Sequence, residues 1–283
     1  MKKPYFLFIY CCILLLSHNG FSQKIFDIHI HGTADIPQQL KTLERVGVYK
    51  AAVSSSWKLQ SSYRSQENLE ILHGLMLACP DGQVPYSNQY CFDSKKDFPD
   101  LAWVEKQIIE GKIDFIGEIL SQYYGISPST KKLYPYYELA EKYGLPVGIH
   151  TGLAGPNHGS ANFKVSLGNP ISLEGLLRDF PTLKVWIMHA GAPFIEETIA
   201  IMAYYHNVYA DISAISNPDI FPPRQFYNIM KRLVDAGFEN RLMFGSDNGD
   251  IEKVVENVNS LDFLSQQQKD KIFHLNAGKF FAR

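Results

Sequence analysis

The stretch Ile25-Phe26-Asp27-Ile28-His29-Ile30-His31-Gly32 combines the apolar pattern of a strand with two histidines at its end. Alternate residues of a strand point to the same side of a sheet, so His29 and His31 are expected to project together. Asp27 is expected on the same face, packed low in the fold, with a role in orienting a ligand as the alternative. The Gly-rich turn of an open dinucleotide-binding sheet does not follow this strand.

Three further apolar runs end in a residue type that binds metal ions. They are Pro146-Val147-Gly148-Ile149-His150, Val185-Trp186-Ile187-Met188-His189 and Leu242-Met243-Phe244-Gly245-Ser246-Asp247. A parallel barrel gathers the carboxyl ends of all its strands at one face. Residues from both ends of the chain can therefore meet around one ion.

The remaining sequence alternates short apolar runs with amphipathic stretches. We predict strands over residues 24–31, 48–54, 74–79, 113–119, 146–151, 184–189, 208–211 and 241–246. We predict helices over residues 36–46, 101–110, 131–143, 172–179, 195–205 and 226–236. Glycine or proline soon after these helices is a stop signal. Eight strand-helix units with short connections favour an α/β fold, a (β/α)8 TIM barrel, which typically needs about 250 residues.

The first residues have the composition of a secretory signal peptide. The basic start Met1-Lys2-Lys3 precedes an apolar run over residues 5–16, and Gly20-Phe21-Ser22 offers small residues for cleavage. The apolar run is too short to span a bilayer comfortably. We expect residues 1–22 to be removed and residues 23–283 to form a single metal-dependent hydrolase barrel domain. Export to the periplasm or the cell exterior would follow, without a stable membrane anchor.

The charge balance indicates which partners to expect. Lys and Arg number 27 and Asp and Glu number 29, for a formal net charge of −2. Nucleic-acid-binding proteins cluster basic residues, and this sequence shows no such cluster. We therefore expect a small-molecule substrate and no nucleic acid, and the sequence is compatible with a homo-oligomer.

Two cysteines, Cys79 and Cys91, lie beyond the expected signal peptide and lack a zinc-binding spacing. An oxidising compartment would permit a disulfide between them. The alternative is two free, buried thiols. We slightly favour the thiols, because a cysteine at a strand end must happen to face the following loop within reach.

The strand ends offer a ligand set for one or two divalent ions, with zinc as the expected metal. Zinc binds neutral imidazoles and carboxylates, and a catalytic site leaves one position for water. The candidate ligands at the strand ends are His29, His31, His150, His189 and Asp247. One strand-end histidine would commonly be structural, but their convergence predicts a metal site.

Glu118 stands in the apolar run Phe115-Ile116-Gly117-Glu118-Ile119 of the predicted fourth strand. A carboxylate in such surroundings is costly to bury unless it is paired or coordinated. We predict that Glu118 binds one metal or bridges two. A salt bridge inside the barrel is the alternative.

These residues resemble the amidohydrolase superfamily, most closely its amidohydrolase-related branch of metal-dependent TIM-barrel hydrolases. The resemblance is carried, in order and spacing, by His29-Ile30-His31, His150-Thr151-Gly152, His189-Ala190-Gly191, Asn207-Val208-Tyr209-Ala210-Asp211-Ile212-Ser213 and Phe244-Gly245-Ser246-Asp247. It covers essentially the whole chain after residue 22.

The resemblance implies a mechanism and roles for these residues. It implies that His29, His31 and His150 bind the catalytic ion and that Asp247 binds it or lies beside it. A metal-bound hydroxide would attack an ester, lactone or amide carbonyl, with Asp247 as the proton shuttle. His189 would bind a second ion or polarise the carbonyl. Glu118 resembles the carboxylate that bridges two metals in TatD-like hydrolases.

Other activities are compatible with the resemblance. Some members of this branch are metal-dependent decarboxylases, and TatD-like relatives hydrolyse phosphoesters with two metals. Few Arg or Lys residues occur in the loops of the catalytic face, which argues against phosphate. A secreted metal- or ligand-binding barrel without turnover is the non-enzyme alternative, and the complete ligand set argues against it.

Four loop or strand-end residues are candidates for supporting roles. Arg64 follows the second strand and suits a carboxylate or phosphate, with a surface salt bridge as the alternative. Tyr123 would line or cap the pocket, and His158 lies in a long loop, where a solvated histidine is the alternative. Asp211 is a candidate for holding Ser213 or a histidine in place, with a purely structural role as the alternative.

Overall fold

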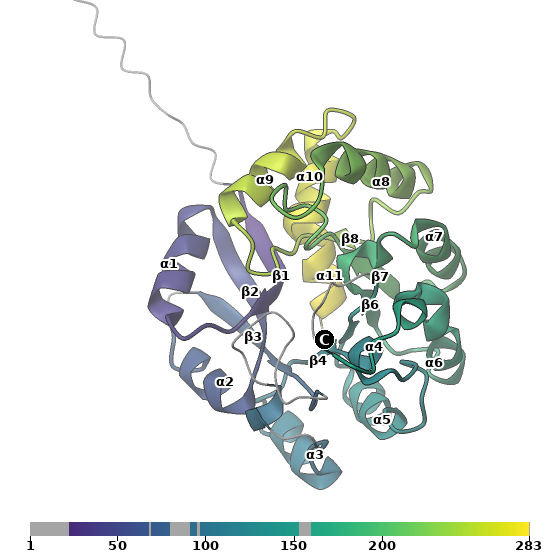
Figure 1. Ribbon diagram of the computed structural model, residues 1–283. Coiled ribbons are helices and arrows are strands. Elements are labelled where there is room, and N and C mark those ends of the chain that lie inside the picture. Colours follow the sequence, from purple (N-terminus) through teal and green to yellow (C-terminus); the bar gives the residue numbers. More distant parts are fainter. Residues whose placement is uncertain (1–22, 68, 80–90, 95–96, 153–159, 283) are drawn as a thin grey trace, which may run out of the picture.

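The structure is a computed structural model that describes residues 23–67, 69–79, 91–94, 97–152 and 160–282. Within these residues, eight parallel strands form one sheet in the order β1 to β8, and helices surround the resulting ring (Figure 1). The prediction of a (β/α)8 TIM barrel is confirmed. The expected signal peptide at residues 1–22 and the loop residue His158 lie outside the described residues.

The strands are short, and most of their residues are buried. They are β1 (Ile25–His31), β2 (Val48–Ser55), β3 (Glu70–Leu75), β4 (Phe115–Ile119), β5 (Val147–Ile149), β6 (Val185–Ile187), β7 (Val208–Asp211) and β8 (Leu242–Met243). The predicted third strand was placed too late in the sequence. β3 begins at Glu70, which is exposed and pairs with Lys50 of β2. The first four residues of β3 are exposed or half-buried, so no apolar run marks its start.

The α-helices alternate with the strands and add a C-terminal group. They are α1 (Ile36–Arg45), α2 (Trp57–Tyr63), α3 (Leu101–Ile109), α4 (Ser121–Tyr124), α5 (Tyr134–Tyr143), α6 (Glu174–Asp179), α7 (Ile195–Tyr204), α8 (Pro223–Asp235), α9 (Ile251–Asn259), α10 (Gln266–Asp270) and α11 (Asn276–Phe281). Short turns of other helical types are η1 (Phe92–Ser94), η2 (Val165–Gly168), η3 (Pro170–Leu173), η4 (Met188–Gly191) and η5 (Lys271–Leu275).

Local signals explain where the predicted helices begin and end. The Asp35 side chain accepts the N–H of Gln38 and caps α1, as side-chain oxygens do at helix starts. Gly144 ends α5 with φ of 66°, a conformation that glycine adopts without strain. The sequence prediction missed α2 and α4, which follow strands closely, and the helices after β8.

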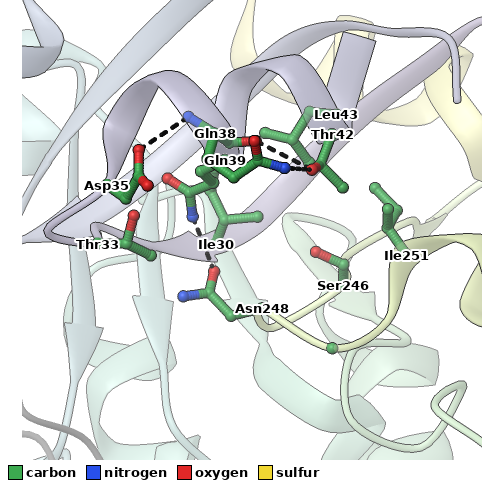
Figure 2. Close-up of a pocket in the computed structure, with 11 residues that line it drawn as sticks. Ile30, Thr33, Asp35, Gln38, Gln39, Thr42, Leu43, Ser246, Asn248 and Ile251 are labelled. Atoms are coloured by element: carbon green, nitrogen blue, oxygen red, sulfur yellow. Dashed lines mark hydrogen bonds between the residues drawn. The ribbon is translucent and has the colours of Figure 1, made fainter. Parts of the chain in front are cut away.

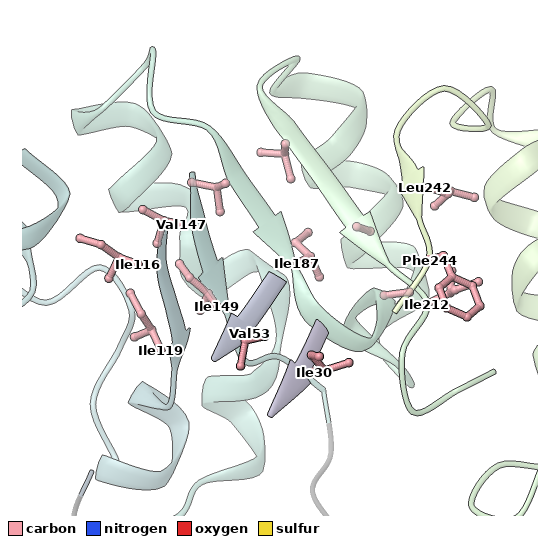
Figure 3. Packing of buried hydrophobic residues seen from close by; sticks show 14 of the residues in the cluster. Ile30, Val53, Ile116, Ile119, Val147, Ile149, Ile187, Ile212, Leu242 and Phe244 are labelled. Carbon is pink, nitrogen blue, oxygen red and sulfur yellow. The ribbon is translucent and has the colours of Figure 1, made fainter. Parts of the chain in front are cut away.

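Apolar side chains form two layers on either side of the strands. The outer layer lies between strands and helices, and Figure 3 shows strand residues such as Ile30, Val53 and Ile187 in it. The inner layer joins Phe26 and Trp186 to Phe280 of α11 and its neighbours. Figure 1 places α11 near the middle of the ring. Because Phe26 lies at the start of β1, α11 covers the amino ends of the strands, and their carboxyl ends are left for a site.

The ring closes between β1 and the segment after β8. Ile28 donates its N–H to Phe244 O at 3.1 Å. An irregularity in the pairing of β1 with β2 interrupts the alternation of its side chains, so Ile28 and His29 both face inward. Asp27 therefore does not share the face of His29, as simple alternation predicted. Its Oδ1 instead accepts the N–H groups of His29 (3.2 Å) and Ser246 (3.1 Å).

Cys79 and Cys91 form a disulfide with a Cα–Cα distance of 5.7 Å, so the slight preference for free thiols was wrong. β3 ends at Leu75, which leaves Cys79 in the loop itself, where the chain has room to turn toward Cys91. Both cysteines pack with Met76, Leu120 and Tyr123. In the described part of the chain, no helix is long and apolar enough to span a membrane.

Candidate active site

The predicted metal ligands meet at the carboxyl ends of the strands. Their nitrogen and oxygen atoms form three groups, each with atoms within 4.8 Å of one another: His29, His189 and Asp247; His29, His31 and Glu118; and Glu118, His150 and His189. All of these residues except Asp247 are buried. The described structure therefore brings together six residues from five different strand ends.

Two of these residues lie in turns after strands that end earlier than predicted. β6 stops at Ile187, shortly before His189, and β8 stops at Met243, four residues before Asp247. His189 and Asp247 have φ values of 57° and 49°, in the left-handed region, where a strand cannot continue. The chain therefore turns away from the sheet at His189 and Asp247.

Glu118 lies at the centre of the site, and each of its oxygens faces a different pair of histidines. Oε2 is 3.2 Å from His31 Nε2 and 4.0 Å from His29 Nε2. Oε1 is 2.7 Å from His150 Nδ1 and 3.7 Å from His189 Nε2. Burial alone would raise the pKa of Glu118, but the hydrogen bonds from the histidines hold this pKa well below its usual range. Glu118 is thus a buried carboxylate at neutral pH.

The carboxylates favour positive charge on the histidines of this cluster. Burial opposes protonation of His31, but its hydrogen bonds to Asp247 and Glu118 raise its pKa to about 10. For His189, burial has the same opposing effect, and Glu118, Asp247 and Asp211 raise the pKa to about 9. Protons supply this positive charge in the metal-free protein, and a divalent cation can replace them.

One donor atom of the cluster also fits a metal ion because it has no other partner. Nε2 of His29 is buried, has no hydrogen-bond partner among the described residues, and faces Glu118 and Asp247 at 4.0 Å and 3.7 Å. A buried polar atom without a partner costs about 1–3 kcal/mol, which coordination of a metal would remove. Imidazole nitrogens with carboxylate oxygens are the ligands that zinc prefers.

Asp247 stands at the open side of the cluster. Its Oδ1 is 3.3 Å from His31 Nε2 and 3.7 Å from His29 Nε2, and a quarter of its side chain is exposed. Burial would raise its pKa, but the charge of His29 and the hydrogen bond from His31 lower this pKa to about 2. Asp247 is therefore an ionised base that both the cluster and an entering molecule can reach.

Two residues that the sequence analysis missed hold the end of β1. Asn248 accepts the N–H of His31 and donates to its carbonyl oxygen, both at 3.0 Å. Gln39 of α1 donates to the same carbonyl at 2.9 Å. Asn248 and Gln39 line a cavity of about 350 Å³ between α1 and the segment after β8 (Figure 2). In the sequence, the one indication that Asn248 supports the site is its position directly after Asp247.

The candidate substrate contacts have different surroundings. The Tyr123 ring lies 5.1 Å from the His150 ring and 5.0 Å from that of Phe163, so the structure brings Tyr123 to the cluster. Arg64 follows α2 and stacks over Trp57 at 4.7 Å. Among the described contacts, none joins Arg64 to the histidine–carboxylate cluster.

Asp211 lies beneath the cluster at the end of β7. It accepts hydrogen bonds from His29 Nδ1 at 2.9 Å and from Ser213 Oγ at 2.6 Å. The sequence analysis named Ser213 or a histidine as the group that Asp211 holds, with a purely structural role as the alternative, and Asp211 contacts both Ser213 and His29.

Comparison with known proteins gives one family and one fold. The sequence model of a family described as amidohydrolase matches residues 117–283. No curated protein is significantly similar in sequence to this chain. Similar solved structures include a TIM-barrel protein from Bordetella bronchiseptica, with 16% identity, a TM-score of 0.65 and coverage of 91% of this chain and 98% of that chain.

Two of the similar structures are named enzymes. A 2,6-dihydroxybenzoate decarboxylase from Rhizobium has 11% identity and a TM-score of 0.62, with coverage of 92% of this chain and 98% of that chain. A dihydroorotase from Saccharomyces cerevisiae has 14% identity and a TM-score of 0.64, with coverage of 92% and 84%. At these identities, the similarity establishes a shared fold.

Proposed function

The chain belongs to the amidohydrolase family, and from this premise we propose that it hydrolyses an ester, lactone or amide bond in a small molecule. Its membership makes it a metal-dependent enzyme of the amidohydrolase type. The observation that carries the proposal is the position of Glu118, whose two oxygens each face a pair of buried histidines. Asp247, an ionised and partly exposed carboxylate, stands beside them.

The residues that would hold metal follow from these groups. His29, His31 and Glu118 provide one site, while Glu118, His150 and His189 provide another. Because the two sites share Glu118, we propose two ions, with one ion as the alternative. Zinc suits the mixture of imidazole and carboxylate ligands. When bound, such an ion polarises a carbonyl oxygen and makes water acidic enough to react at neutral pH.

Asp247 supplies the proton transfer in this proposal. Its carboxylate is ionised in the resting protein and accepts a proton from the attacking water at an Oδ atom. The same atom then donates this proton to the leaving group as the bond breaks. A positioned acid–base group of this kind contributes about 100- to 10,000-fold to the rate.

The surrounding residues orient the substrate. The side chain of His189 points into the cluster, with Nε2 3.7 Å from Glu118 Oε1, so it can serve as a second-metal ligand or face the substrate carbonyl. Tyr123 and Phe163 form an aromatic wall beside His150. We propose that this wall contacts the apolar part of the substrate.

We also propose that the protein is exported. The pattern of residues 1–22 is that of a signal peptide. A disulfide between Cys79 and Cys91 suits an oxidising compartment, because such bonds are rare in the cytosol. Fractionation of cells that express the full chain would test this proposal, and recovery in the cytosol with residues 1–22 intact would contradict it.

A substrate panel tests the hydrolytic function. The purified protein, stripped with a chelator and then reloaded with Zn²⁺, would be assayed on a p-nitrophenyl ester, a lactone, an N-acyl amide, a phosphodiester and an aromatic carboxylate. We expect turnover of a carbonyl substrate that requires Zn²⁺ and is lost in Asp247→Asn. The matched control is Asp250→Asn, since Asp250 is an exposed residue that caps α9 and pairs with Lys253, and asparagine is an equally good cap.

The other outcomes identify the alternatives. Release of carbon dioxide from the aromatic carboxylate would indicate a decarboxylase. Cleavage of the phosphodiester alone would indicate a TatD-like phosphoester hydrolase, an activity that a Glu118-bridged pair of ions would also suit. Tight Zn²⁺ binding without turnover of any carbonyl substrate would contradict the proposed hydrolysis.

A further inference from the structure

Asp211 and Ser213 form a hydrogen-bonded pair that contacts two of the candidate metal ligands from below. Both residues are fully buried. Asp211 Oδ2 is 2.9 Å from His29 Nδ1, and Ser213 Oγ is 2.9 Å from His189 Nδ1. His29 belongs to β1 and His189 follows β6, and their rings stack with centroids 5.1 Å apart.

The positions of the hydrogens follow from counting donors and acceptors. An ionised carboxylate can only accept, so the 2.9 Å contact requires a hydrogen on His29 Nδ1. Ser213 has one hydroxyl hydrogen, which it gives to Asp211 Oδ1 at 2.6 Å. Its oxygen must then accept from His189, which requires a hydrogen on His189 Nδ1 as well. A neutral imidazole with its hydrogen on Nδ1 has a free lone pair on Nε2.

We propose that Asp211 is a positioning residue that, directly and through Ser213, keeps the hydrogen on Nδ1 of both His29 and His189. Nε2 of each ring is thereby left free to bind a metal ion. The inference rests on the proposed metal-dependent function. It extends that function by assigning one buried pair as the common support of ligands in both metal groups.

The backbone contacts of Asp211 explain why asparagine is a poor replacement. Oδ1 also accepts the N–H groups of His189 (2.9 Å) and Ser213 (3.0 Å). An asparagine oxygen would remain on the side of these three donors, so its NH₂ group would face His29 Nδ1. Ser213 Oγ, at 2.9 Å, would then be the one acceptor left among the described contacts of His29 Nδ1. The tautomer with hydrogen on Nε2, which blocks a metal, would gain population because Nδ1 could accept from the asparagine.

Imidazole NMR tests the proposal without an activity assay. In protein labelled with ¹⁵N at histidine, we expect Nδ1–H signals from His29 and His189 that exchange slowly with solvent, assigned by His29→Gln and His189→Gln. In the wild-type protein, we expect these Nδ1–H signals both with and without Zn²⁺. Absence of a protected Nδ1–H at His29 would overturn the proposal even if every variant failed to fold.

Zn²⁺ affinity, measured by competition with a chromogenic chelator, gives a second readout. We expect the His29 Nδ1–H signal of Asp211→Asn to weaken and to exchange faster with solvent, and we expect this variant to bind Zn²⁺ about 10- to 100-fold more weakly. Ser213 Oγ lies 2.9 Å from Nδ1 of both histidines. Ser213→Ala should have a smaller effect than Asp211→Asn, because Asp211 still accepts from His29 and the carbonyl of residue 213 remains 3.4 Å from His189 Nδ1. The matched control is Asp114→Asn, whose carboxylate accepts the N–H of His73.

The outcomes separate this proposal from the proposed function. If Asp211→Asn keeps both the His29 signal and wild-type Zn²⁺ affinity, the positioning role is wrong and the hydrolase proposal stands. If the wild-type protein binds no Zn²⁺, the proposed function fails, while the protected Nδ1–H signals still decide the role of Asp211.

Discussion

Reduction of the Cys79–Cys91 disulfide should lower the stability of the protein by an amount that follows from the loop it closes. The cysteines are separated by 12 positions in the sequence. Chain-entropy arithmetic for a loop of this length gives about 3 kcal/mol. Because 1 kcal/mol shifts the melting temperature of a domain of this size by about 2 °C, the expected decrease is about 6 °C.

Urea unfolding of oxidised and reduced wild-type protein measures this difference directly. Reduction keeps the sulfur atoms in place, so it isolates the covalent link from the packing of Cys79 and Cys91 against Tyr123. Cys79→Ala/Cys91→Ala should be less stable than the reduced wild type, because it also leaves a cavity. Equal unfolding free energies of the oxidised and reduced forms would refute the entropic argument.

Three further predictions concern the metal site. His29→Ala/His31→Ala should lose bound metal in elemental analysis, and full occupancy in that variant would remove these residues from the ligand set. Glu118→Gln should reduce a two-ion protein to one ion; a wild-type protein with a single ion would instead assign Glu118 to substrate orientation or ligand support. The metal-free protein should lose stability as the pH rises through about 9 to 10, because the pKa values of His189 and His31 are raised to about 9 and about 10 in the folded state. Their stabilising contribution is complete below the unfolded-state value of about 6.5 and disappears above the folded values. Urea unfolding at pH 7 and pH 10 checks this, and an undiminished effect in His31→Gln would contradict it.

The sequence predicted the barrel and the convergence of its ligands because both depend on local patterns. Apolar runs with stop signals gave the number of strands, and parallel packing placed residues such as His150 and Glu118 at one face. Strand ends were less predictable. The first residues of the third strand, from Glu70 on, are exposed or half-buried. Their pairing with β2 places them in the sheet, and no single segment reveals such a pairing.

The supporting residues of the site were predicted only in part, for the same reason. Asp211 was a candidate, but its contact with His29 joins residues 182 positions apart. The hydrogen bonds of Asn248 and Gln39 to the backbone of His31 require α1 and the segment after β8 to lie side by side, where both line the same cavity. The inward direction of both Ile28 and His29 depends on an irregularity in strand pairing, which an alternating pattern cannot show.

The inner layer of the barrel has a consequence for the order in which the chain can fold. Phe26 and Phe280 belong to the same buried cluster, although they stand near opposite ends of the chain. During synthesis, the strands that carry Phe115 and Trp186 exist long before α11 is available to cover them. The interior is therefore completed last, after nearly the whole polypeptide has been made, and only then is the floor beneath the histidines closed to water.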